Sequence, residues 1–392
     1  TDNFAKAATD VFDAHGMLAI PGLINCHTHS YMSLFKNIAD DLPFDEWLFG
    51  RIMPLEDRMT ADDAYWCTLL SCAEMLRRGT TCFADMHMFE SMCAKAAVDA
   101  GMRAVMCRGL TDTDGTEGGL RRLREAENDM EAFRSNGMLT HMLAPHAIYT
   151  CSNDYLKSVI AEAKLLGVGL HTHLSETQYE FDTCMKQHGM TPCAYLESIG
   201  FFDLPVIAAH CVYLTDEDIG ILKKHDVTVI TNPKSNLKLA NGIAPVEKLR
   251  KASVRVAIGT DGSSSNNALN MFSEMNMLAL LQKGLTKDPT AAPAQYVFNC
   301  ATQSGADALG IDSGLLAPGK NADIVLLDMK RPQLIPLNDP ESALVYSADG
   351  SETDSVFIGG KPVLLRGVLQ SIDENFVFEK VKAIISKLTE KN

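Results

Sequence analysis

The sequence predicts an α/β protein built on a TIM-like (β/α)8 barrel, with a small β-sandwich-like unit formed from the two ends of the chain. Eight short apolar runs alternate with helix-like stretches. The runs are mostly apolar on both faces, as the strands of a closed parallel sheet must be. Five of them end in or beside a histidine, aspartate or glutamate. Because such a barrel carries its active groups at the carboxyl ends of its strands, we expect a functional site there.

The expected elements follow one another regularly along the chain. The eight strands end near His29, Met86, Leu110, Tyr149, Glu176, Val212, Asn236 and Gly262. Helical patterns separate them at residues 61–78, 91–100, 120–133, 153–166, 191–199, 216–224 and 244–251. Two more helical patterns, at 268–283 and 294–309, follow the last strand.

After these helices the alternation of helix and strand patterns gives way to strand patterns joined by turns, which predicts a second structural unit. Residues 315–327 and 355–364 have the pattern of turn-linked strands, and Gly359-Gly360 favours a hairpin. We therefore expect a barrel at 21–312, a small β domain at 313–370 and an amphipathic helix at 371–392. Residues 1–20 are expected to be a remnant of the small β domain.

Composition limits the possible partners and locations. The chain has 392 residues, 46% of them hydrophobic, and a net charge of -15 with scattered Lys and Arg. This charge disfavours nucleic acid and anionic membranes, and a small molecule is the expected partner, with a homo-oligomer possible. An odd number of cysteines, eleven, and the lack of a signal-like or membrane-spanning segment favour reduced thiols in the cytoplasm. The chain begins with Thr1, which leaves open whether residues precede it.

The first expected strand ends in His27-x-His29. Residues i and i+2 of a strand point to the same side, so both imidazoles can reach one ion. Alone, such a pair is more often incidental than a metal site. The signal gains strength from the groups that follow at later strand ends: His146, His173 with Glu176, His210 and Asp261.

Five separated motifs carry a resemblance to a known family. They are Pro-Gly-Leu-Ile-Asn-x-His-x-His at 21–29, His-Leu-Ser-Glu at 173–176, Thr-Asn-Pro-Lys-Ser-Asn-Leu-Lys-Leu at 231–239, Gly-Thr-Asp-Gly at 259–262 and Pro-Gly-Lys-x-Ala-Asp at 318–323. The chain resembles the amidohydrolase superfamily of metallo-dependent hydrolases, and more narrowly its 5'-methylthioadenosine/S-adenosylhomocysteine deaminases. Family members usually have more sequence before the first histidine pair, where this chain has 26 residues.

The resemblance implies a site for one divalent metal ion per chain, Zn2+ as first choice and Fe2+ as second. The ligands that match the mononuclear members are His27, His29, His173 and Asp261. Binuclear relatives usually carry a lysine at the end of the fourth strand, and residues 142–147 contain none. His146, at that strand end, then resembles a substrate contact.

The resemblance also implies a reaction, the hydrolytic cleavage of a cyclic amidine C–N bond. A metal lowers the pKa of bound water. Glu176 would relay a proton to the ring nitrogen, Asp261 would take the proton of the water and pass it to the departing amine, and His210 would hold or polarise the water. A 5'-substituted adenosine (S-adenosylhomocysteine, 5'-methylthioadenosine, and in principle adenosine or 5'-deoxyadenosine) would become its inosine analogue plus ammonia.

Further residues match substrate-binding positions of the family. Glu56 would accept hydrogen bonds from ribose hydroxyls, although an acid before Thr60 could also simply favour a helix N-terminus. Arg108 and Arg121 resemble arginines that grip a homocysteine carboxylate. Arg122 and Arg124 are alternatives to Arg121 on the same helix. Trp47 and Ser265 match other pocket positions.

Several alternatives stay open from the residues alone. His171 could replace His173 as a ligand, His210 could be a core histidine, and Asp261 could start a turn. The function could be deamination of another heterocycle, of guanine, pterin or triazine type. A non-catalytic metal-binding relative is the other class, but a structural ion would not need Glu176 and His210 beyond four ligands.

Overall fold

The structure is a computed structural model that describes residues 11–390. Within these residues, eight parallel strands form one sheet in sequential order. They are β2 (Leu23–Thr28), β3 (Thr80–His87), β4 (Arg103–Leu110), β5 (Leu139–Pro145), β6 (Leu170–Leu174), β7 (Val206–His210), β8 (Thr228–Thr231) and β9 (Val256–Ile258). The backbone N–H groups of Thr260 and Asp261 donate to the carbonyl of His27, which brings the two edges of the sheet together. The predicted (β/α)8 barrel is confirmed.

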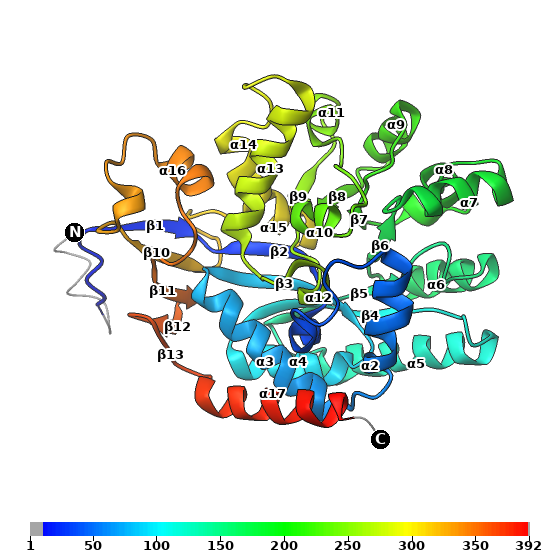
Figure 1. Cartoon of the computed structure of the whole chain (residues 1–392), viewed down its shortest axis with the longest axis horizontal. Helices are drawn as coiled ribbons and strands as arrows, with labels where there is room; N and C mark the ends of the chain where they lie inside the picture. The colour runs from blue at the N-terminus through cyan, green and yellow to red at the C-terminus, as the bar shows by residue number, and fades with distance from the viewer. Residues whose placement is uncertain (1–10, 391–392) are drawn as a thin grey trace.

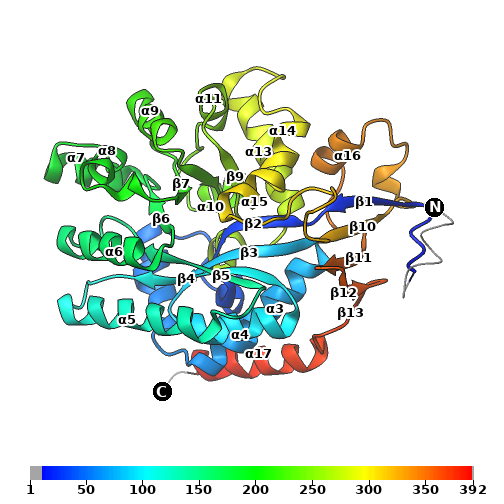
Figure 2. The ribbon, with the colours of Figure 1, turned by 180° about the vertical axis from the view of Figure 1, so that it is seen from behind.

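Helices surround the strands, as Figures 1 and 2 show. Those between successive strands are α3 (Ala61–Arg77), α4 (Glu90–Ala100), α5 (Thr116–Phe133), α6 (Asn153–Leu166), α7 (Gln178–His188), α8 (Pro192–Ser198), α9 (Asp216–Lys224), α10 (Pro233–Lys238) and α11 (Val246–Lys251). Local sequence determines where α3 and α9 begin. The side chains of Thr60 and Thr215 each accept a hydrogen bond from the backbone N–H of the aspartate three residues later, and the carboxylate of that aspartate accepts one from the backbone N–H of the threonine. A helix at 178–188 was not expected from the apolar pattern.

The region after the barrel differs in detail from the expectation. The helical pattern at 268–283 is α13 (Met271–Thr286), preceded by the short α12 (Ser263–Asn266). The pattern at 294–309 is two helices, α14 (Ala294–Cys300) and α15 (Gln303–Leu309), because Thr302 leaves the helical conformation at φ -132° and ψ -94°. The freed Ala301 carbonyl accepts a hydrogen bond from the N–H of Ile24, so this break contacts the start of β2. Short helical turns precede α3: η1 (Ser30–Phe35), η2 (Glu46–Ile52) and α2 (Met53–Glu56).

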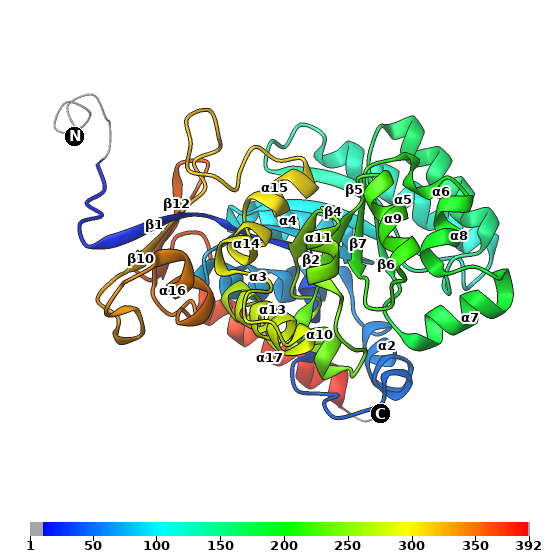
Figure 3. The ribbon, with the colours of Figure 1, turned by 90° about the horizontal axis from the view of Figure 1, so that it is seen from above.

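A second, antiparallel sheet lies beside the barrel (Figures 1 and 3). It consists of β1 (Met17–Pro21), β10 (Ile324–Asp328), β11 (Thr353–Ile358), β12 (Lys361–Leu365) and β13 (Val368–Leu369). The predicted hairpin is present: Gly359 and Gly360 have φ of 58° and 78° between β11 and β12. Residues 1–10 of the expected N-terminal segment, and 391–392 of the C-terminal helix, lie outside the described residues. The exact domain boundaries stay a prediction.

Two helices complete the described chain. α16 (Pro340–Tyr346) lies between β10 and β11, and α17 (Glu374–Thr389) runs along α3 in Figure 1. Arg77 of α3 pairs with Glu374 at the start of α17. None of the helices within residues 11–390 is both long and apolar enough to cross a membrane.

Side chains alternate between two buried layers along the strands. Phe83, Met106 and Leu143 belong to the large apolar core that includes the surrounding helices. Residues one position away, such as Cys82, Val105 and Met142, form a second cluster that contains members from most strands of the barrel. This second cluster fills the barrel interior, because neighbouring residues of a strand face opposite sides. The polar groups described next lie above it, at the strand ends.

Candidate metal and catalytic site

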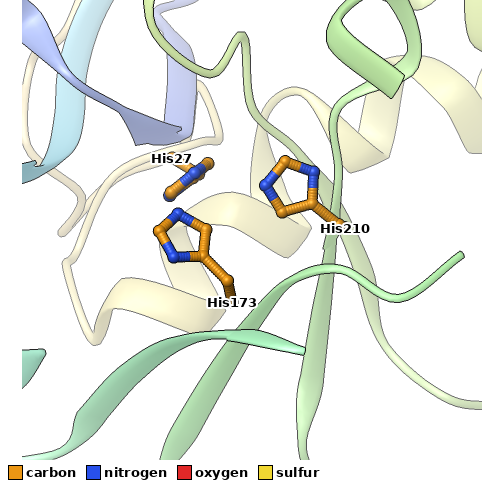
Figure 4. Close-up of side chains that lie close together, drawn as sticks. All are labelled: His27, His173 and His210. Atoms are coloured by element: carbon orange, nitrogen blue, oxygen red, sulfur yellow. The ribbon is translucent and has the colours of Figure 1, made fainter. Parts of the chain in front are cut away.

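Five side chains from four strand ends converge at one point; we call them the inner cluster: His27, His29, His173, His210 and Asp261. Ligand atoms of His27, His173 and His210 lie within 4.8 Å of one another, and their rings are seen together in Figure 4. The same holds for His27, His29 and Asp261. Asp261 Oδ1 is 3.4 Å from His27 Nε2 and 3.3 Å from His29 Nε2. The structure thus brings together all four sequence-predicted ligands and adds His210 within reach.

The backbone at these strand ends is unusual. His210 and Asp261 have φ of 73° and 61°, and Ser175, next to Glu176, has φ of 50°. A residue other than glycine in this left-handed region is uncommon and is tolerated where the surrounding structure demands it. The backbone therefore leaves the extended strand conformation at or next to residues whose side chains form the site.

The Nδ1 atoms of three imidazoles are fixed by hydrogen bonds that leave Nε2 facing the centre. The Nδ1–H of His29 donates to the Met86 carbonyl at 2.5 Å, and that of His173 to the His146 carbonyl at 2.8 Å. The Nδ1–H of His210 donates to Asn236 Oδ1 at 2.8 Å. Such outer contacts are the usual way in which proteins orient metal-binding histidines.

His27 is held by another histidine rather than by a carbonyl. Its Nδ1 lies 2.9 Å from His171 Nε2, and His171 Nδ1 lies 3.4 Å from Cys107 Sγ. With Nε2 of His27 facing the cluster, Nδ1–H donates to His171, whose own proton then sits on Nδ1. His171 was the alternative ligand of the His171-Thr172-His173 motif; the structure places it behind His27 instead.

Asp261 is held by two hydroxyl groups on its far oxygen. Ser235 Oγ donates to Asp261 Oδ2 at 2.5 Å and Ser265 Oγ donates to the same atom at 2.8 Å. Ser265 was expected from the resemblance to contact substrate, yet its hydroxyl is engaged with Asp261 and the Gly262 carbonyl. Trp47, expected in the pocket, is buried and its indole N–H donates to the Ser264 carbonyl at 3.3 Å. Ser235 was missed by sequence reasoning, although it lies in the 231–239 motif.

Burial sets the charge state of the inner cluster. Desolvation lowers the pKa of His27 to about 4 and lowers the pKa of His173 well below its usual value, so both imidazoles are neutral near pH 7. Burial would raise the pKa of Asp261, but the adjacent imidazoles of His27 and His29 hold it well below its ordinary value. His27 Nε2 is a buried atom with no hydrogen-bond partner. An unpartnered nitrogen on the neutral imidazole of His27, beside the neutral His173 and the carboxylate of Asp261, fits a divalent metal ion.

Glu176 stands beside this cluster. It is 6% exposed, its Oε1 accepts from Asn241 Nδ2 at 3.0 Å, and its Oε2 is 3.9 Å from His210 Nε2. Burial raises its pKa. Glu180, in the first turn of α7, accepts the backbone N–H groups of Ser175 and Glu176 at 3.0 and 2.8 Å and so fixes this turn. Glu180 and Asn241 were not expected from the sequence, and no motif reading pointed to either.

Two residues expected to bind a nucleoside flank the inner cluster. Glu56, in α2, accepts a hydrogen bond from the Tyr31 hydroxyl, and burial raises its pKa. The His146 ring centroid lies 4.6 Å from that of His173, and His146 Nδ1 lies 3.0 Å from Thr150 Oγ1. Desolvation lowers the pKa of His146 to about 3, which keeps the ring neutral.

The two expected arginines lie apart from the inner cluster. Arg108 is buried and donates to Glu125 Oε2 at 2.8 Å, while Arg121 is exposed and its Nε lies 3.7 Å from Glu125 Oε1. Arg121 also donates to Asp114, as does Arg122, which donates to the Thr111 carbonyl as well. Of Arg121 and Arg122 on α5, Arg121 is therefore the one that lies near Glu125, the partner of Arg108.

A parallel barrel whose strand ends join a His-x-His pair, two further histidines and an aspartate defines a metal-dependent barrel hydrolase. The sequence profile of the Amidohydrolase family matches residues 18–363, and the chain belongs to this family.

Relatives with known names cover nearly the whole chain. A 5-methylthioadenosine/S-adenosylhomocysteine deaminase of Moorella thermoacetica is 46% identical over 381 residues, 95% of this chain and 88% of the relative. A 5'-deoxyadenosine deaminase of Methanothermobacter thermautotrophicus is 45% identical over 384 residues, 97% of this chain and 90% of the relative. Among solved structures, an adenosine deaminase from Xanthomonas campestris with bound zinc superposes with a TM-score of 0.92 at 34% identity, covering 95% of this chain and 86% of that one.

Proposed function

We propose that this protein is a metal-dependent aminohydrolase that replaces the 6-amino group of 5'-substituted adenosines by a carbonyl oxygen and releases ammonia. The names of the relatives at 45 and 46% identity support the substrate class. The observation that carries the chemistry is Glu176, a buried carboxylate 3.9 Å from His210 and outside the set of four expected ligands. A metal ion with a purely structural role would need neither Glu176 nor His210.

The residues that would hold the metal are His27, His29, His173 and Asp261. Their imidazole and carboxylate donors, and the zinc of the similar solved structure, favour Zn2+ over Fe2+. A divalent ion in this place supplies a water molecule of lowered pKa, and hence a nucleophile near neutral pH.

The remaining groups move protons. Glu176, with its pKa raised by burial, suits a carboxyl group that gives a proton to the ring nitrogen beside the attacked carbon. Asn241 and the backbone contacts of Glu180 hold it in place. His210, whose Nδ1–H is bound to Asn236, would present Nε2 to the water. Asp261 would accept a proton from the water and pass it to the departing amine.

The substrate would be oriented by groups on either side of this centre. Glu56 is proposed to accept the ribose hydroxyls, since a carboxylate accepts two hydrogen bonds at once. His146, neutral and adjacent to His173, is proposed to contact the purine. All eleven cysteines are free and buried, which supports the proposed location in the reducing cytoplasm. A homo-oligomer stays a prediction.

Ammonia release across a panel of substrates tests the proposal. The panel is S-adenosylhomocysteine, 5'-methylthioadenosine, 5'-deoxyadenosine, adenosine, guanine and an aminotriazine. We expect turnover of the 5'-substituted nucleosides and little with the bare heterocycles. Turnover of guanine or the triazine alone would overturn the substrate class and the ribose role of Glu56.

Metal analysis should give about one zinc per chain, and two tightly bound ions would contradict the single-metal assignment.

A further inference from the structure

Glu274, on α13, is a fully buried carboxylate outside the inner cluster. Each of its oxygens accepts a hydrogen bond from a different segment of the chain. Oε1 accepts from Asn266 Nδ2 at 2.8 Å, and Oε2 accepts from the backbone N–H of Lys234 at 3.1 Å. Lys234 belongs to α10 and Asn266 to α12, and α10 contacts both α12 and α13. One carboxylate therefore ties together two segments that are not adjacent in the chain.

These two segments carry the hydroxyl groups that hold Asp261. Ser235 directly follows Lys234, and its hydroxyl donates to Asp261 Oδ2 at 2.5 Å. Ser265 directly precedes Asn266, and its hydroxyl donates to the same atom at 2.8 Å. Because both donors are on Oδ2, the other oxygen of Asp261 faces the histidine pair of the first strand, where the metal is proposed to bind.

Asn266 extends the connection to the backbone beside Asp261. Its Nδ2 has two hydrogens, and besides the contact with Glu274 it donates to the Thr260 carbonyl at 2.6 Å. Thr260 directly precedes Asp261. The carboxylate of Glu274 thus contacts a neighbour of each serine directly and, through Asn266, the residue before the proposed ligand.

We propose that Glu274 is a positioning residue for the metal centre, because it keeps the hydroxyls of Ser235 and Ser265 on Oδ2 of Asp261 and so keeps Oδ1 directed at the ion. This inference rests on the proposed function. In the described part of the chain, the side-chain hydrogen bonds of Glu274 go to the neighbours of these serines. Glu274 therefore acts on Asp261 through other residues, as outer partners of metal ligands do.

The test is the zinc affinity of Glu274→Gln, measured by competition with a chelator at about pH 8, above the pKa of about 7 to which burial raises Glu274. An amide has one acceptor oxygen and one NH2 group, so its nitrogen must face one of the two N–H donors and that contact is lost. We expect zinc affinity to fall about tenfold. With zinc saturating, kcat should fall while KM for 5'-methylthioadenosine changes by less than about twofold, because the contact orients a metal ligand and not the substrate.

A double-mutant cycle shows whether Glu274 acts through the serines. In a Ser235→Ala/Ser265→Ala background the hydroxyls that Glu274 is proposed to hold are absent. Adding Glu274→Gln to this background should therefore change zinc affinity by less than about twofold. An equal fall in both backgrounds, or no fall in either, would overturn the inference.

Glu247→Gln is the matched control. Glu247 is 3% exposed and accepts the backbone N–H of Ala292 at 3.0 Å, but it lies on α11 and pairs with Arg250. The same substitution at this buried carboxylate should leave zinc affinity at the wild-type value. A fall as large as that of Glu274→Gln would overturn the inference, since any lost buried carboxylate would then have the same effect.

If Glu274→Gln does not fold, Asn266→Ala takes its place, with Ser265→Ala as the background. It should lower zinc affinity more where Ser265 is present than where Ser265 is replaced, and equal falls would overturn the inference. Wild-type protein that binds no zinc would overturn the proposed function and this inference with it. Zinc binding of equal affinity in wild type and variants would overturn the inference alone.

Discussion

Two buried clusters of histidine and carboxylate side chains occur in the same barrel and differ in the charge state of their histidines. The inner cluster joins four histidines and one aspartate at the strand ends. The other group, which we call the outer cluster, consists of Asp85, His87 and Cys93, between β3 and the helices α3 and α4. The outer cluster, and each of two overlapping sets of three residues in the inner cluster, have ligand atoms within 4.8 Å of one another. Spacing alone would mark either as a metal site.

The charge state of the histidines separates the two clusters. In the outer cluster, Asp85 accepts from the N–H and Oγ of Ser30 at 2.7 and 2.5 Å and from His87 Nε2 at 2.5 Å. Although burial acts to lower the pKa of His87, Asp85 raises it well above its usual value, so the pair is an ion pair. In the inner cluster, burial lowers the pKa of His27 to about 4, and its Nε2 has no partner. Each cluster has one imidazole nitrogen without a partner, Nε2 of His27 and Nδ1 of His87, so an unpartnered atom alone does not separate them. The inner cluster differs in the neutral imidazoles of His27 and His173, which suit an ion better than a buried ion pair does.

The largest expected effect separates the clusters by metal content. Asp261→Asn removes the one carboxylate of the inner cluster, and we expect loss of bound metal with a fall in deamination of about a thousandfold or more, since a proton acceptor is lost too. Elemental analysis of the purified variant and ammonia release measure both effects. Asp85→Asn is the paired control and should keep the metal. Retention of metal by Asp261→Asn with loss of metal from Asp85→Asn would reverse the assignment of the two clusters.

The next effect concerns chemistry without metal loss. Glu176→Gln keeps the size of the side chain and its contact with Asn241 but cannot give the proton. We expect full metal content and a kcat reduced by about 10² to 10⁴. Elemental analysis and steady-state kinetics on the same preparation check this. A variant with near wild-type turnover would falsify the role of Glu176 as proton relay.

A smaller effect is expected where one histidine supports another. His171→Phe removes the acceptor of the His27 Nδ1–H, and we expect metal affinity to fall about 10- to 100-fold. Competition with a chelator measures the affinity directly, independent of turnover. His188→Gln, at the exposed end of α7, is the control and should leave affinity unchanged. Unchanged affinity in His171→Phe would mean that His27 needs no support from behind.

In the outer cluster the expected effect is on stability. Asp85→Asn leaves His87 buried without its carboxylate partner, and the free energy of unfolding should fall by about 3 kcal/mol. Urea denaturation of the metal-bound protein measures it. Val105→Ala, a buried change in the barrel interior without any charge, indicates how much of the loss is general. A variant as stable as wild type would show that the ion pair contributes nothing.

The last expected effect is small over any one pH unit and comes from a buried carboxylate that belongs to neither cluster. Burial raises the pKa of Glu274 to about 7, above its usual 4.5. The folded protein then holds a proton that the unfolded chain has released, so stability is fully present below about pH 4.5 and declines as pH rises to about 7. The slope is at most about 1.4 kcal/mol per pH unit. Denaturation curves at several pH values should show a flatter profile for Glu274→Gln, and an identical slope would contradict the assignment.

Much of the fold followed from local patterns, and the failures have local causes. Most barrel strands and α3, α6 and α9 were predicted within a few residues because apolar runs and threonine or serine caps mark them. The strand expected to end near Asn236 is the exception, because β8 ends at Thr231 and Asn236 lies in α10. The 294–309 pattern continued through Thr302, where a contact with β2 breaks the helix. A polar helix such as α7 has few apolar positions to reveal it.

The sequence by itself determined the class of fold and the order of the strand-end motifs, because residue type and period are local properties. The four expected ligands came from its resemblance to a family. Only the tertiary structure decided which side chains support the expected ligands and the arginines by hydrogen bonds. His171 behind His27, Ser235 and Ser265 behind Asp261, and Glu125 between the arginines depend on elements far apart in the chain. The His-x-His pair could be read from one strand. The group of histidines and one aspartate that suits a metal ion required four strand ends to meet.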